Sequence, residues 1–206
     1  MSIDDLWYKN AVIYCLDVEK YQDTNGDGIG DFEGLSRRLD YLAGLGATCI
    51  WLQPFYTSPN RDNGYDVTDY YNVHEKHGSL GDFVNFMNRA EALGLRVIVD
   101  LVVNHSSIDC RWFREARESR TSPYRDWYIW ADERPKDHRE GIVFPGEQTS
   151  TWAFDRKAGQ YTSIVSTTIR PTSIPGIRTC APRSRESWAS GFSSVCPASG
   201  WMPCRS

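Results

Sequence analysis

The sequence predicts an α/β fold built on a parallel sheet. Three apolar runs of strand length alternate with two segments in which apolar residues recur at helical spacing. The last run, 97–103, is rich in Val, Ile and Leu, which is typical of a strand buried on both faces. This strand–helix–strand–helix–strand order favours parallel pairing with right-handed crossovers.

The first two strands and the helix between them follow from local patterns. The first strand is expected over 11–16, Ala-Val-Ile-Tyr-Cys-Leu. A helix is expected over 35–45, because leucine recurs there at helical spacing and Gly46 supplies a C-terminal stop. The second strand is expected over 47–52.

The second helix carries its own start signal. Ser79 and Asp82 have the spacing of a capping box, and Gly94 ends the pattern. The apolar face of this helix is expected to comprise Leu80, Phe83, Met87, Ala90 and Leu93. The third strand then occupies 97–103.

Loop lengths indicate which edge of the sheet carries function. Each helix returns to the next strand through a few residues, whereas the loops 17–34 and 53–78 that follow the strands are long. Long loops in compact domains are usually functional. A third and longer excursion after His105 is rich in Trp, Tyr, Arg and Asp, and it predicts a small inserted domain.

Composition excludes several classes of partner. The chain has 206 residues, 40% of them hydrophobic, which is enough for a core, and no apolar run approaches membrane-spanning length. A net charge of −4 gives no reason to expect nucleic acid or a membrane surface as partner. The polar segment 1–9 favours a cytoplasmic location. The six cysteines show no metal-binding spacing, and Cys15 and Cys49 are expected to be buried in strands.

The first long loop has the pattern of a calcium site. Asp23, Asn25, Asp27 and Asp31 alternate with glycines and place an oxygen at almost every second position, and Ile29 can add its carbonyl. A short loop encloses Ca²⁺ in this way. It lacks the closing Glu of an EF-hand, and the alternative is an Asp/Gly-rich solvated turn.

The second long loop offers sugar-binding chemistry. The Asp62 carboxylate and the Tyr65 ring, three residues apart, could hydrogen-bond hydroxyls and stack under a pyranose. The alternative is a turn built by Asn63 and Gly64, with Asp69 as a helix cap.

The third strand ends in polar side chains, Asn104 and His105. Polar groups at the end of a buried parallel strand usually lie at a substrate site. For Asn104 alone, a helix N-cap is the more ordinary interpretation.

Together these segments resemble the start of an α-amylase superfamily glycoside hydrolase, on the trehalose synthase and α-glucosidase side. The resemblance runs from about Leu6 to Tyr161. The matching pieces are Trp7-Tyr-Lys-Asn-Ala-Val-Ile-Tyr14, Asn25-Gly-Asp-Gly-Ile-Gly-Asp-Phe32, Trp51-Leu-Gln-Pro-Phe-Tyr-Thr-Ser-Pro59, Asp62-Asn-Gly-Tyr-Asp66 and Asp100-Leu-Val-Val-Asn-His105.

The resemblance implies site residues and ligands. Asp62, Tyr65 and His105 would line the subsite for the glucosyl ring of an α-glucoside such as maltose or a short maltooligosaccharide. Calcium would be held by the set Asp23, Asn25, Asp27, Ile29 and Asp31.

The resemblance also implies a (β/α)8 barrel of which this chain supplies a part. Residues 1–104 would form the first three βα units, and 105–161 part of the domain inserted after the third strand. The family's catalytic carboxylates follow later strands, at the roughly 5–5.5 Å separation that retaining hydrolysis requires. We therefore expect the 206-residue chain to be inactive by itself. The alternative is a non-catalytic sugar- or calcium-binding module.

The composition changes after Tyr161. Residues 162–206 contain one acidic residue, Glu186, and five arginines, and helical or strand periodicity is lost. A tail without regular structure is expected. Suitable codons for 195–204, read one base out of frame, give Val-Ser-Gly-Phe-Arg-Met-Asp-Ala-Val, which resembles the family's strand-four motif. The sequence thus predicts a one-base frameshift near Tyr161, biological or introduced during sequencing.

Overall fold

The computed structural model describes residues 3–143 and 145–164, so nearly all of the expected tail lies outside the described residues. Two compact units account for the described chain. The first comprises 3–55 and 71–100, and the second comprises 56–70 together with the described part of 101–164. The loop 56–70 therefore groups with the residues from 101 on, although it lies before the predicted division at 104.

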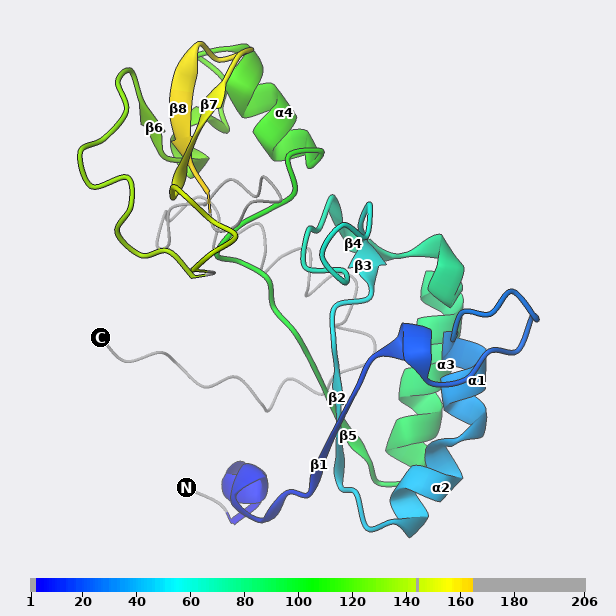
Figure 1. The fold of residues 1–206 in the computed structure, drawn as a ribbon. Helices are drawn as coiled ribbons and strands as arrows, with labels where there is room; N and C mark the ends of the chain where they lie inside the picture. Colours follow the sequence, from blue (N-terminus) through cyan, green and yellow to red (C-terminus); the bar gives the residue numbers. More distant parts are fainter. Residues whose placement is uncertain (1–2, 144, 165–206) are drawn as a thin grey trace. The chain divides into compact units, whose positions relative to one another are not determined.

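The first unit contains the expected parallel sheet, so the predicted α/β class is confirmed (Figure 1). Strands β1 (Ile13–Leu16), β2 (Cys49–Leu52) and β5 (Arg96–Val99) pair in the order β1-β2-β5. Both pairings are parallel and in simple register. Strand β5 ends four residues before the predicted limit of 103, because the Asp100 N–H makes the last bond, to the Leu52 carbonyl (3.2 Å).

Three α-helices cover one side of this sheet (Figure 1). The predicted first helix is divided at Arg38 into α1 (Phe32–Arg37) and α2 (Leu39–Gly44). Helix α3 (Leu80–Ala92) begins with the predicted capping box of Ser79 and Asp82. The remaining helical segments are short 3-10 turns, η1 (Ile3–Asn10), η2 (Val18–Lys20) and η3 (Glu75–His77).

The buried face of α3 differs from the predicted one at two positions. Leu80 is 42% exposed, and Phe86 is fully buried in its place. Phe86 packs against Phe32 of α1, with ring centroids 5.6 Å apart, and Phe83 packs beside it. The prediction that Leu80 is buried was wrong. Leu80 is the first residue of α3, directly after the N-cap Ser79.

On the opposite face of the sheet, Ile13 of β1 and Trp51 of β2 keep 46% and 40% of their surface exposed. Cys15 is exposed as well, so its predicted burial was wrong, whereas Cys49 is buried as expected. Among residues 3–143 and 145–164, helices cover only one side of the sheet, and β1 is an outer strand.

The second unit contains the loop 56–70 and the segment that the sequence predicts to be an inserted domain, called the insert below. Strand β3 (Tyr56–Thr57) pairs with β4, whose bounds are Asp69–Val73. A helix and a three-stranded sheet in the order β6-β8-β7 form the insert. These elements are α4 (Arg111–Glu118), η4 (Arg125–Trp127), β6 (Trp130–Ala131), β7 (Trp152–Asp155) and β8 (Gln160–Ser163).

Aromatic side chains make the core of the insert. Phe113 of α4 is fully buried and stacks on Trp130, with centroids 5.6 Å apart and planes 8° apart. Strand β8 continues two residues past the predicted break at Tyr161, and Thr162 is 1% exposed. Backbone pairing tolerates many sequences, and Thr is a good strand former.

Across residues 3–143 and 145–164, the helices are too short or too polar to span a bilayer.

Candidate functional site

The three parallel strands end at a common edge of the sheet, where a polar residue follows each. These residues are Asp17, Gln53 and Asp100. The Trp51 indole donates a 2.7 Å hydrogen bond to the Asp100 carboxylate and links two neighbouring strands. Sequence reasoning did not single out Asp17 or Gln53, although each is the first polar side chain after an apolar run.

In the second unit, a tight turn positions Asp62 and Tyr65. The Tyr65 N–H donates to the Asp62 carbonyl (2.9 Å), and the two residues between them, Asn63 and Gly64, have φ of 47° and 85°. Positive φ at both positions fits an Asn-Gly turn. The predicted turn is confirmed, but Asp69 lies in β4 and does not cap a helix.

His105 lies against this turn. Its side chain is 8% exposed, and its Nε2 is 3.0 Å from the backbone carbonyl oxygen of Tyr65. The Tyr70 hydroxyl donates to the His105 carbonyl (2.9 Å) and fixes the backbone there. The structure thus joins the three sugar-site candidates through one turn and one side-chain contact.

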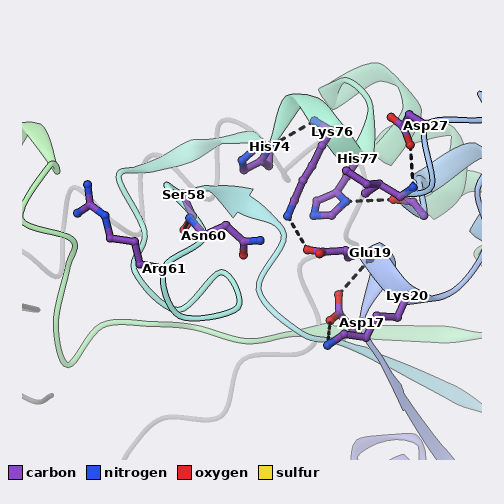
Figure 2. Close-up of polar contacts among 12 residues, drawn as sticks. Asp17, Glu19, Lys20, Asp27, Ser58, Asn60, Arg61, His74, Lys76 and His77 are labelled. Carbon is purple, nitrogen blue, oxygen red and sulfur yellow. Dashed lines mark hydrogen bonds and ion pairs between the residues drawn. The ribbon is translucent and has the colours of Figure 1, made fainter. Parts of the chain in front are cut away.

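A buried carboxylate that the sequence analysis missed supports the same loop. Asp66 is 2% exposed and accepts hydrogen bonds from the Ser58 hydroxyl (2.6 Å) and the Arg61 N–H (3.2 Å). Figure 2 shows Ser58, Asn60 and Arg61 on this loop. The Asn60 N–H also donates to the Ser58 hydroxyl (2.9 Å). Asp66 follows Tyr65 directly, which was the only signal for it in the sequence.

Asn104 does not cap a helix. It is exposed, and the N-cap of the next helix, α4, is Cys110. Asn104 instead borders an open cleft of about 360 Å³ in the second unit. The lining mixes polar and apolar residues, and it comprises Asn104, Asp137, Glu140, Gly141, Val143, Thr151, Trp152, Ser163 and Ile164.

The calcium-loop candidates lie together in the first unit, between η2 and α1. Asp23 accepts backbone N–H bonds from Asn25 (3.0 Å), Gly26 and Gly28 (both 2.8 Å). The bonds from Gly26 and Gly28 hold the pKa of Asp23 below its usual value. Asp27 likewise accepts from the Ile29 N–H (2.8 Å). The loop is therefore wrapped around its own carboxylates.

Asp31 has a different local role from Asp23. It is 6% exposed and caps α1 through the Gly34 N–H (2.7 Å). Its second oxygen accepts from both the N–H and the hydroxyl of Thr24. These bonds lower the pKa of Asp31 although burial opposes the shift.

The donor chemistry of this loop fits a hard cation, because every candidate offers oxygen. Among the described residues, no three His, Cys, Asp or Glu side chains gather closely enough to hold a metal ion. A cation would therefore have to draw on the Asn25 amide and the Ile29 carbonyl as well. The structure brings the five candidates into one loop, and it ties Asp31 to the start of a helix.

Comparison with known proteins identifies the family. The family described as alpha amylase, catalytic domain, matches residues 15–171, which is most of the chain. The chain belongs to the α-amylase family. Solved structures similar to this chain are TIM-barrel enzymes, and they match about 90% of its residues. The prediction that the chain forms part of a (β/α)8 barrel is therefore confirmed.

Relatives of this chain lie on the expected trehalose synthase and α-glucosidase side of the family. A trehalose synthase from Thermus thermophilus is 50% identical over 159 residues, which cover 77% of this chain and 16% of that protein. An oligo-1,6-glucosidase from Heyndrickxia coagulans is 44% identical over 158 residues, covering 75% of this chain and 28% of that protein. The crystal structure of a Bacillus licheniformis trehalose-6-phosphate hydrolase superimposes with a TM-score of 0.82 at 36% identity, covering 91% of this chain and 34% of that chain. The chain thus spans about a third or less of the length of these proteins.

Proposed function

We propose that this chain is the substrate-gripping N-terminal part of a retaining enzyme that acts on α-glucosides in carbohydrate metabolism, by hydrolysis, transglucosylation or maltose/trehalose isomerisation. The observation that carries the proposal is the contact between His105 and the turn of Asp62 and Tyr65. Relatives named as trehalose synthase and oligo-1,6-glucosidase support an α-glucoside as substrate class.

The chemistry of the three residues suits a glucosyl ring. The Asp62 carboxylate can accept from a vicinal pair of hydroxyls, and the Tyr65 ring offers a flat apolar face. His105 is held against the Tyr65 carbonyl through Nε2, which fixes its ring beside the turn that carries Asp62 and Tyr65. Maltose or a short maltooligosaccharide is the proposed ligand. The cytoplasmic location stays a prediction.

Calorimetry with maltose and maltotriose tests the sugar site. We expect weak binding by the 206-residue chain and at least a ten-fold loss in His105→Ala, because a buried orienting side chain is removed. The matched control is His138→Ala, which removes an imidazole whose Nδ1 lies 3.1 Å from the nearby Pro135 carbonyl. Equal affinities in the chain and in His105→Ala would overturn the assignment.

We further propose that the 206-residue chain performs no catalysis. Retaining glycosidases need two carboxyl groups flanking the bond, and by resemblance these follow strands beyond β5. Maltose turnover by the purified chain would refute this. The alternative interpretation of the sequence, a non-catalytic sugar- or calcium-binding module, additionally requires that the chain be a folded monomer when it binds maltose or Ca²⁺.

Calcium is the proposed ion of the first loop, held by Asp23, Asn25, Asp27, Ile29 and Asp31. Support comes from the alternating oxygens and from Gly26 and Gly28, whose φ of 84° and 85° lets the chain wrap tightly. The ion would supply fixed positive charge that orders the loop. Calorimetry with Ca²⁺ on the chain and on Asp23→Asn/Asp27→Asn tests it, and undiminished binding by the double variant would argue against this site.

We also propose the frameshift near Tyr161. The family match ends at residue 171, in the region where the composition changes. Resequencing the gene across the Tyr161 codon is the test. An open downstream frame encoding Gly-Phe-Arg-Met-Asp is the expected result, and its absence would remove the proposal.

A further inference from the structure

The C-terminal end of the first loop, which we call the loop exit, is held by hydrogen bonds to both backbone groups of Gly30. Its N–H donates a 2.7 Å hydrogen bond to the Glu19 carbonyl in η2. Its own carbonyl lies 3.1 Å from Nδ1 of His77 in η3, 47 residues further along the chain. Figure 2 shows the His77 ring directed toward this part of the loop. The loop exit is thus fixed to two separate elements.

His77 is buried, with 4% of its surface exposed. Burial is the main cause that lowers the pKa of His77 below the ordinary histidine value, so the ring is neutral at pH 7. A neutral imidazole carries one N–H, and the Gly30 carbonyl can only accept. Nδ1 therefore carries the proton and donates it to Gly30.

An ion pair ties the same two elements together. Lys76, which precedes His77 in η3, pairs with the Glu19 carboxylate, and the two side chains are 15% and 33% exposed. This contact lowers the pKa of Glu19. We call the set Glu19, Gly30, Lys76 and His77 the clasp.

The fit at the centre of the clasp is tight. A Cβ atom on Gly30 would lie 2.1 Å from the Val18 carbonyl oxygen. The next residue, Asp31, is held in turn by its N–H, which donates to the Gln22 carbonyl (3.0 Å). The segment that supplies the last two candidate calcium ligands, Ile29 and Asp31, is therefore docked on the unit before any ion arrives.

We propose that His77 is a positioning residue for the first loop, and that the clasp sets the affinity of this loop for calcium. The inference rests on the proposed calcium site and adds to it the residues that prepare the site. A preformed loop loses less conformational freedom when the ion binds. Hydrogen-bond partners behind the ligands of a metal site typically change its affinity 10–100-fold.

The first test compares two replacements of His77 in the 206-residue chain by calcium calorimetry. His77→Phe keeps a flat ring but has no donor, and we expect calcium to bind 10–100-fold more weakly. His77→Asn places an amide N–H near the position of Nδ1, and we expect recovery to within about threefold of the original affinity. His138→Phe, the same change in the other unit, is the control and should bind as the original chain does.

A second measurement needs no metal. Amide hydrogen exchange at Gly30 and Asp31 in calcium-free protein should be faster in His77→Phe than in the original chain, and close to the original in His77→Asn. Lys76→Met, which removes the ion pair but leaves the imidazole, should also accelerate exchange at Gly30. This variant provides an independent reading if His77→Phe does not fold.

The outcomes separate this inference from the calcium site. Equal calcium affinity in the original chain and in His77→Phe would overturn the clasp and leave the site intact. Unchanged exchange at the Gly30 amide in both His77→Phe and Lys76→Met would overturn it as well. Failure of the original chain to bind calcium would overturn the site and this inference together.

Discussion

The Ser58 hydroxyl donates a 2.6 Å hydrogen bond to the Asp66 carboxylate, and both side chains are buried. This bond spans the loop that carries Asp62 and Tyr65. It links Ser58, which directly follows strand β3, to the residue directly after the candidate sugar contacts. The position of the sugar site therefore depends on a pair of residues that need not touch a ligand.

Ser58→Ala should weaken the loop. The change leaves the buried Asp66 carboxylate with one fewer donor, which costs about 1–3 kcal/mol. Faster amide exchange at Tyr65, whose N–H closes the turn, is the expected readout. The exposed Ser119→Ala serves as control. Identical exchange at Tyr65 in both variants would contradict the proposed support.

Gly30→Ala should be far more damaging than Gly44→Ala. The added Cβ at Gly30 would meet the Val18 carbonyl oxygen at 2.1 Å, whereas nothing lies within 4 Å at Gly44. Since Gly44 lies in α2, alanine there should stabilise by about 0.5–1 kcal/mol. Urea titration of both variants measures the difference, and equal midpoints would show that the loop exit is not tightly docked.

Acid should destabilise the first unit through His77. Burial lowers the pKa of His77 from the ordinary value of 6.5, so the unfolded chain takes up a proton more readily than the folded one. The contribution of His77 to stability is therefore complete above pH 6.5 and is lost as the pH falls through the lowered pKa.

The measurement is the change in the free energy of unfolding between about pH 7.5 and about pH 5.5, one value on each side of the ordinary histidine pKa. We expect a smaller change in His77→Phe, which has no group to titrate. Lys76 lowers the pKa of Glu19 as well, so the carboxylate keeps its charge over this range and adds its own loss only in stronger acid. An identical pH dependence in both proteins would exclude His77 as the cause.

Arg125→Lys should destabilise the insert. Arg125 is 8% exposed, and its guanidinium carbon lies 3.8 Å from the Trp130 ring centroid. The guanidinium donates to the Ala116 carbonyl (2.8 Å) and to the Gln160 amide oxygen. The two acceptors are met by separate guanidinium nitrogens, whereas lysine has all its donors on one nitrogen, so we expect at least one acceptor to lose its donor, at a cost of about 1–3 kcal/mol.

Arg111→Lys is the matched control for Arg125→Lys. Arg111 is exposed and pairs with Glu115 along the same helix, so a change within about 0.5 kcal/mol is expected. Thermal unfolding of the two variants gives the comparison. Equal melting temperatures would show that Arg125 is replaceable.

The features that the sequence predicted correctly are those set by residues close together in the chain. The capping box of Ser79 and Asp82 and the turn at Asn63 and Gly64 depend on a few neighbouring residues, and both form as expected. The parallel order followed from apolar periodicity. The roles of the calcium and sugar residues stay predictions, because no ligand contact is part of the structure.

Long-range pairs were beyond that reasoning. His77 and Gly30 are 47 residues apart, and neither has a neighbour that indicates the other. The exposure of Cys15 was missed for a similar reason, because burial depends on what covers a strand and not on its own sequence. Turns and caps at the candidate sites are thus predictable from neighbouring residues, whereas the distant residues that hold them are not.

The outer strands β1 and β5 each have one side without a partner strand among the described residues, and the sheet face beside them exposes Ile13 and Trp51. Edge strands of this kind can pair with strands of another molecule. The oligomeric state of this polypeptide should therefore depend on its concentration, and light scattering per molecule should rise as the solution is concentrated. Dilution would then be the simplest way to keep the protein monomeric.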